Sequence, residues 1–243
     1  MTDTNNRQSQ SLGRIGKAMF LQESVWVQSW RAAARSLISG YVDAYTLLNF
    51  GVYASFMTGN TTSAGVHAGQ INIAAAAHSL LPIPFFMLGI LGGTLIVQAD
   101  QARALRRLSI LVAAMLVLAA AVVYRAWPEW LSIMTLSCAM GFLNTSITSV
   151  GRQAVSLGFM TGDLNSLARQ IAMEIKDERG ALPQNVLDNH WRRTGVLASL
   201  WITFFTGAVL GTVIASHIGA WTLLLPAFAL LVLTVTERAA IPA

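Results

Sequence analysis

The chain has 243 residues, of which 54% are hydrophobic and only 11% are charged, and its formal net charge is +5. Soluble domains carry about 25% charged residues, so this composition excludes an ordinary cytosolic enzyme and predicts an integral membrane protein. The single cysteine, Cys138, excludes an intrachain disulfide, and no basic cluster interleaved with aromatic residues points to nucleic acid.

The first thirty residues precede the apolar segments. Residues 1–13 are polar and lack the compact apolar core of a signal peptide, so we expect a disordered tail within the region 1–28. Residues 15–30 mix apolar and polar positions. This pattern fits an interfacial amphipathic helix before the first span, and it fits a helical extension of that span equally well.

Six apolar segments follow, each near the ~20 residues that a helix needs to cross a hydrocarbon core of about 30 Å. They cover residues 29–53, 80–98, 108–124, 130–150, 194–216 and 218–236. The stretch 163–193 is the most charged, and apolar residues at helical spacing in its first half predict a helix along the inner membrane face. We therefore expect an all-α fold with six transmembrane helices.

The basic residues orient these spans. If the N-terminus is cytoplasmic, 15 of the 16 lysine and arginine residues fall on the cytoplasmic side, and only Arg125 falls outside. The positive-inside rule then predicts six crossings with both termini in the cytoplasm.

The second half of the chain repeats three features of the first half, in the same order. The pairs are Gly-Tyr-Val-Asp at 40–43 with Gly-Phe-Leu-Asn at 141–144, Phe-Met-Thr-Gly at 56–59 and 159–162, and Gly-x-x-x-Gly at 89–93 and 207–211. Three matches in register are not expected by chance. The Gly-x-x-x-Gly pairs favour close helix packing within the chain, or a dimer interface, over substrate contact.

The repeat predicts an inverted topology. The halves, residues 29–124 and 125–243, would each hold three crossings, and because three is odd they would insert in opposite directions. Inverted repeats are typical of secondary transporters, whose substrate site lies near the membrane midplane at the repeat interface.

The two Phe-Met-Thr-Gly tetrapeptides predict broken or re-entrant helices. Glycine relaxes the backbone, and Thr, Asn or Asp can cap a helix that restarts after the break. The free N–H groups of such a helix would point at the break and attract an electron-rich group. The alternative is a loop that ends the span at the membrane surface.

Asp43 is the only one of the eleven acidic residues that is predicted deep in a span. A charge at the bilayer centre costs about 3 kcal/mol on insertion scales, so such residues usually face a cavity and serve ions, protons or substrate. The alternative is a carboxylate that is hydrogen-bonded to a neighbouring helix for packing alone. Asn144, its repeat partner, would be an uncharged ligand.

These motifs resemble a known family. The elements at 40–44 and 56–61, together with those at 141–144 and 160–162, resemble the YoaK family of bacterial inner-membrane proteins, which are filed under a domain of unknown function. The resemblance covers roughly residues 30–236. It implies a bacterial six-helix protein of the inner membrane and supplies no substrate.

The function expected from these features is a secondary transporter of a small polar or ionic solute. The candidate substrate- or ion-binding residues are Asp43, Thr58, Gly59, Asn60, Thr61, Asn144, Thr161, Gly162, Asp163 and Asn165. The four histidines have no metal-ligand spacing, so we expect no metal or cofactor. We expect lipid and a small solute as partners, no nucleic acid, and a homodimer as an open alternative. An ion or solute channel, or a non-transport scaffold or enzyme, remains the competing interpretation, although the spans contain no catalytic constellation.

Overall fold

The computed structural model describes residues 25–146, 149–150, 153–154, 160–175 and 190–238. The described elements are α2 (Val25–Phe50), α3 (Met57–Gly69), α4 (Ile73–Leu80), α5 (Pro82–Ala99), α6 (Gln101–Tyr124), α7 (Glu129–Ser146), β1 (Ser149–Val150), β2 (Gln153–Ala154), α8 (Met160–Ile175), α9 (His190–Ile218), the 3₁₀ helix η1 (Gly219–Leu223) and α10 (Leu224–Arg238). The two strands form one short antiparallel pair. The expected all-helical character is confirmed apart from this pair.

Each of the six predicted apolar segments corresponds to a helix: α2, α5, α6, α7, α9 and α10. The helix predicted in the charged stretch is α8, which begins at Met160, three residues before that stretch. The predicted interfacial helix at 15–30 lies mostly outside the described residues. The helix expected to restart at the first tetrapeptide is α3, whereas α4 was not predicted.

Length and hydropathy single out three stretches that could cross a membrane. They are Ile73–Ala99, Arg103–Tyr124 and Thr194–Val235, the last of which contains α9, η1 and α10. The helices α2 and α7 are not among them, because polar residues such as Ser36 and Ser132 lower their hydropathy, and both of these side chains are buried. The chain is thus a multi-pass membrane protein whose most apolar helices surround two more polar ones.

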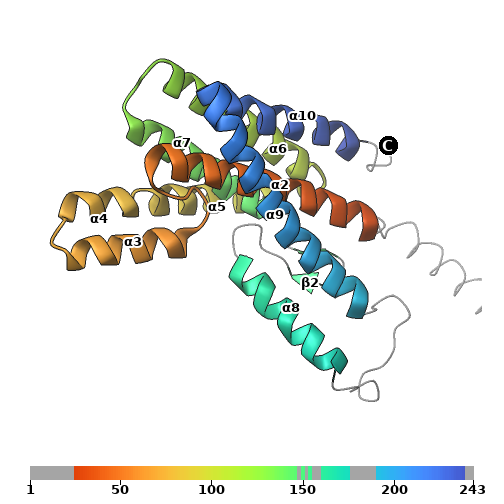
Figure 1. Cartoon of the computed structure of the whole chain (residues 1–243). Helices are drawn as coiled ribbons and strands as arrows, with labels where there is room; N and C mark the ends of the chain where they lie inside the picture. The colour runs from red at the N-terminus through yellow and green to blue at the C-terminus, as the bar shows by residue number, and fades with distance from the viewer. Residues whose placement is uncertain (1–24, 147–148, 151–152, 155–159, 176–189, 239–243) are drawn as a thin grey trace, which may run out of the picture.

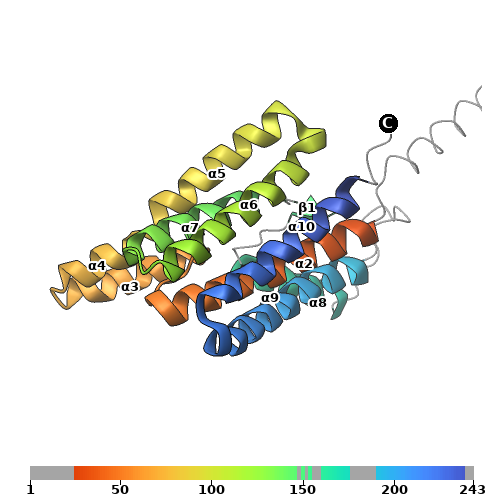
Figure 2. The same cartoon turned by 90° about the horizontal axis from the view of Figure 1, so that it is seen from above.

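The helices form two layers (Figure 2). One layer holds α5, α6 and α7, and the other holds α2, α9 and α10 with α8 beside α9. The start of α2 and the end of α10 lie at the same end of the bundle (Figure 1). The hairpin of α3 and α4 projects from the opposite end.

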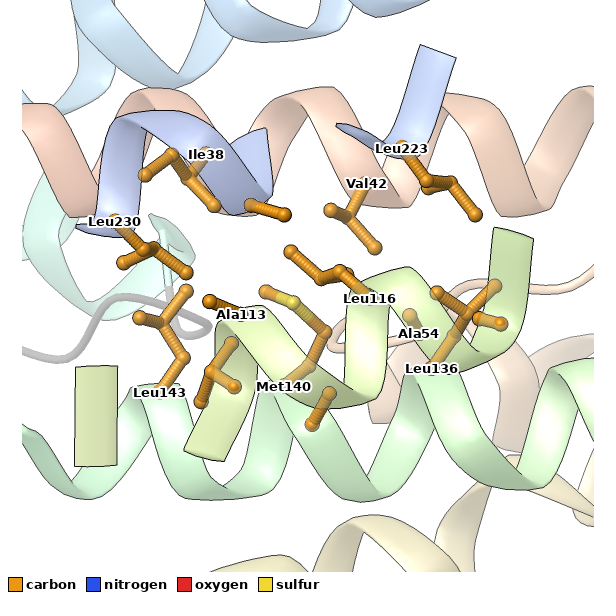
Figure 3. Close-up of a cluster of buried hydrophobic side chains, with 14 of the residues drawn as sticks. Ile38, Val42, Ala54, Ala113, Leu116, Leu136, Met140, Leu143, Leu223 and Leu230 are labelled. Atoms are coloured by element: carbon orange, nitrogen blue, oxygen red, sulfur yellow. The ribbon is translucent and has the colours of Figure 1, made fainter. Parts of the chain in front are cut away.

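An apolar core lies between the layers (Figure 3). Val42 of α2, Leu116 of α6 and Leu230 of α10 are fully buried in it, and Met140 of α7 is almost so. Lipid tails are as apolar as these side chains, so the stabilisation comes from tight packing rather than from removal of water.

Within each layer, two helices pack closely at a pair of facing glycines, and we call each of these contacts a glycine seam. In the first seam, α2 packs on α9, and a Cβ added at Gly40 or Gly207 would meet the backbone carbonyl of Phe204 or Leu37 respectively. In the second seam, α7 packs on α5 through glycines in the same relation. There a Cβ at Gly141 or Gly89 would meet the carbonyl of Phe86 or Cys138. The prediction that the Gly-x-x-x-Gly pairs pack helices within the chain is confirmed.

Candidate functional site

The break in the first half ends at Phe56, the first residue of the tetrapeptide. Helix α2 ends at Phe50, the chain is irregular through residues 51–56, and α3 begins at Met57. The predicted capping role of Thr58 and Asn60 is therefore wrong: both lie inside α3, whose N-cap Phe56 makes no side-chain capping bond. Gly51, with φ of +69°, allows the turn that ends α2.

The second tetrapeptide occupies the same place relative to its helix. Helix α7 ends at Ser146, and α8 begins at Met160, as α3 begins at Met57. Both Met-Thr-Gly motifs thus form the first turn of a helix.

Three consecutive backbone N–H groups of the break are bonded by side chains. Tyr53 N–H donates to Asn60 Oδ1 at 2.9 Å, and Ala54 N–H donates to Thr46 Oγ1 at 3.2 Å. Ser55 N–H donates to Asp43 Oδ1 at 2.7 Å. An irregular backbone inside a membrane protein is tolerated only where its polar groups are satisfied internally, and these side chains supply that satisfaction.

Asp43 and Asn60 each make a second bond to the break. The Ser55 hydroxyl donates to Asp43 Oδ2 at 2.6 Å, so one residue engages both carboxyl oxygens. The Asn60 amide donates to Tyr53 O at 2.7 Å and closes a paired contact with one backbone residue. Both side chains are buried, and they are the two candidate residues that the structure brings onto one segment.

The other first-half candidates point elsewhere. Thr58 and Thr61 are exposed, and Thr61 Oγ1 donates to Met57 O within its own helix. Gly59 lies beneath the rings of Phe56 and Tyr53, which meet edge to face with centroids 5.3 Å apart. Its role in the structure is to leave room for this aromatic pair.

The second-half candidates lie on α7 and α8. Asn144 is half-buried near the end of α7, Gly162 is half-buried, and Asn165 is exposed. The side chains of Thr161 and Asp163 lie outside the described residues. Helix α8 packs on α9 near the end that holds the termini, whereas α3 packs on α4 at the other end (Figure 1). Both helices begin toward the middle of the fold and run from there to opposite ends (Figure 1).

Sequence reasoning missed a buried basic residue in the same helix as Asp43. Arg35 is fully buried, and its Nη2 donates to Ser109 Oγ of α6 at 2.9 Å, across the two layers. Arg31, Arg35, Ser39 and Asp43 recur every four residues, which places them on one face of α2. That spacing was the available signal, but the positive-inside rule counts both arginines among the 15 basic residues on the cytoplasmic side.

Two buried hydroxyls on the central helices have no hydrogen-bond partner among the described residues. They belong to Tyr45 of α2 and Ser137 of α7. A buried polar group left unpaired costs about 1–3 kcal/mol, so each is a place where a polar ligand would be stabilised. In the part of the chain that the structure describes, no three His, Cys, Asp or Glu side chains are placed to hold a metal ion.

Comparison with known proteins gives the family. The model of the DUF1275 family, described as a protein of unknown function, matches residues 32–236. The chain belongs to this family. It is also 30% identical over 203 residues to the UPF0700 transmembrane protein RA0705 of Rhizobium meliloti (strain 1021), which covers 83% of this chain and 82% of that protein. No solved structure matches the chain. The predicted resemblance to YoaK-like membrane proteins is confirmed at the level of this DUF1275 family.

Proposed function

We propose that this DUF1275 protein is a secondary transporter of a small polar or ionic solute in the bacterial inner membrane. It would cross the membrane six times as two inverted three-helix repeats, with both termini in the cytoplasm. The observation that carries the proposal is the equivalence of the two glycine seams.

The equivalence holds for the two facing glycines of each seam, Gly40 with Gly207 and Gly141 with Gly89. On one side of each seam, Gly141 follows Gly40 by 101 positions, as Cys138 follows Leu37. On the other side, Phe204, Gly207 and Gly211 follow Phe86, Gly89 and Gly93 by 118 positions each. Contacts between backbones that recur at constant offsets indicate two copies of one packing arrangement.

Helix direction supports the inversion. In Figure 2, α2, α6 and α9 run away from the end with the termini, whereas α5, α7 and α10 run toward it. The three spans of the first half thus run away from, toward and away from that end. The three spans of the second half run toward, away from and toward it. This is the order expected of inverted three-helix repeats.

The seams also define which parts would move. Each seam joins a helix of one repeat to a helix of the other, α2 with α9 and α7 with α5. Alternating access by one repeat rocking against the other would break both seams. We therefore propose that the layer of α2, α9 and α10 moves against the layer of α5, α6 and α7, across the apolar core of Figure 3.

The proposed solute path runs between these layers. Polar contacts lie toward its two ends, with Arg35 on Ser109 toward one end and Asp43 on Ser55 toward the other. The unpaired hydroxyls of Tyr45 and Ser137 lie on the helices that line it. In this proposal Asp43 binds the coupling proton or cation when the layers separate, and the contact with Ser55 marks the closed state.

The proposal is tested by uptake. Purified protein is screened for small metabolites that raise its Tm, and each such solute is then tested in proteoliposomes under an imposed proton gradient. We expect saturable, gradient-driven accumulation that Asp43→Asn uncouples from the gradient. Single-channel currents would instead establish a channel, and no accumulation of any solute that raises the Tm would overturn transport.

A further inference from the structure

The α3–α4 hairpin is an uncovered projection of the fold. Figures 1 and 2 show it beyond the bundle at the end opposite to the termini. Its base is fixed by His78, whose Nε2 lies 2.9 Å from Phe50 O and 3.5 Å from Glu129 Oε1. Its tip carries two large apolar side chains, Ile71 and Ile73, which are 85% and 67% exposed.

The turn at the tip makes this exposure unusual. Asn72 N–H donates to His67 O at 2.9 Å and Ile71 N–H to Ala68 O at 3.0 Å, the two bonds of a Schellman motif. The residue at the Ile71 position of this motif adopts a left-handed conformation and is usually glycine. Ile71 has φ of +61°, a conformation that a β-branched residue rarely adopts. Neither the backbone nor exposure to water favours isoleucine here.

The surrounding sequence is that of a segment in lipid. Residues 44–99 contain no Asp, Glu, Lys or Arg. The apolar stretch that contains α5 begins at Ile73 and has 27 residues. Such a helix is about 40 Å long, whereas the hydrocarbon core is about 30 Å thick. The 18 residues of α5 alone are about 27 Å long and nearly span that core, so α4 would lie beyond it, in the interfacial region of the leaflet.

We propose that the α3–α4 hairpin inserts into the membrane leaflet on the side away from the termini, with Ile71 and Ile73 in contact with lipid. Lipid is the partner that suits the hairpin, because α4 continues the lipid-facing surface of α5 and no charge on either helix would have to be desolvated. The hairpin would anchor the start of α3, and with it the break at residues 51–56. The proposal is independent of transport.

Spin labels at the tip test this in the full-length protein. In a Cys138→Ala background, single cysteines at positions 71 and 73 are labelled, and the protein is reconstituted in phosphatidylcholine vesicles. Collision rates are measured with oxygen, which concentrates in lipid, and with a water-soluble nickel complex. Leu95→Cys, on the exposed face of α5, is the lipid control, and Arg125→Cys, in the loop after α6, is the water control.

We expect both tip labels to show oxygen accessibility at least about twofold above that of Arg125→Cys and nickel accessibility at least about twofold below it, as at a membrane interface. Nickel accessibility equal to that of Arg125→Cys would place the hairpin in water and overturn the proposal. Dipolar coupling between labels of two copies, with low accessibility to both reagents, would also overturn it, because a second copy would then cover the tip.

Discussion

At the scale of single residues, the buried polar groups of the first half serve a backbone that leaves its helix within the fold. Asp43, Thr46 and Asn60 accept from three successive N–H groups of the break. Each of these N–H groups would cost free energy if it were left unpaired inside the fold. Asp43 thus stabilises the break in addition to its proposed coupling role. Substitutions at this position can distinguish the structural role from the coupling role.

Asp43→Ala should destabilise the protein, and Asp43→Asn should not. Alanine leaves Ser55 N–H and the Ser55 hydroxyl without their partner, a loss of about 1–3 kcal/mol in the free energy of unfolding. Asparagine keeps an oxygen for Ser55 N–H, and its amide can donate to the hydroxyl, so the loss should stay below about 1 kcal/mol. Unfolding in mixed micelles measures both, and equal losses would contradict the bonding role of the carboxylate.

Asn60→Ala should cost more than Thr61→Ala, although the two are neighbours in the tetrapeptide region. Asn60 makes two bonds to Tyr53 and is buried, so its loss removes about 2 kcal/mol. Thr61 is exposed and bonds only its own helix, so its replacement should change stability by at most about 0.5 kcal/mol. The Tm of each variant in detergent measures the two losses. A larger loss for Thr61→Ala than for Asn60→Ala would mean that the break depends on other contacts.

At the scale of elements, small residues decide which helices pair. The sequence indicated that the glycines at 89–93 and 207–211 pack helices, but not which helices they meet. Their partners, α7 and α2, present Gly141 and Gly40 at the contact, and a helix pair can approach this closely only when both sides are small. A single sequence shows the small residues but not the distance between the helices that carry them.

Gly40→Ala and Gly141→Ala should destabilise the protein to a similar extent. In each variant the added methyl overlaps a backbone carbonyl, that of Phe204 or that of Phe86, and backbone cannot move aside as a side chain can. Overpacking of this kind costs about 1–3 kcal/mol. Gly65→Ala is the matched control, because the added methyl meets nothing within 4 Å and alanine favours a helix. A large effect at only one seam would argue against their equivalence.

At the scale of the whole molecule, hydrophobicity predicted six helices and their order, since long apolar segments allow few alternatives. The restart of a helix at the first tetrapeptide was predicted, but its length was not, because Gly59, Gly65 and Gly69 lower helix propensity, and α4 was not predicted as a separate helix. Only part of the candidate site could be predicted from the sequence. Asp43 was found from its rarity in a span, but its partner Ser55 depends on how residues 51–56 fold back on α2, which no local pattern encodes.

Equivalent connections of the two halves should lie on opposite sides of the membrane. Arg103 lies in the first turn of α6, next to the connection from α5, and Ser216 lies in the last turn of α9, next to the connection to α10. Both side chains are exposed. In a Cys138→Ala background, an impermeant maleimide added to intact cells should label Ser216→Cys and spare Arg103→Cys until the membrane is permeabilised. The loop residue Arg125 should behave as Ser216 does, and the α8 residue Asn165 as Arg103 does. Labelling of positions 103 and 216 from the same side would exclude inverted repeats, since an odd number of crossings must separate these two connections for the halves to insert in opposite directions.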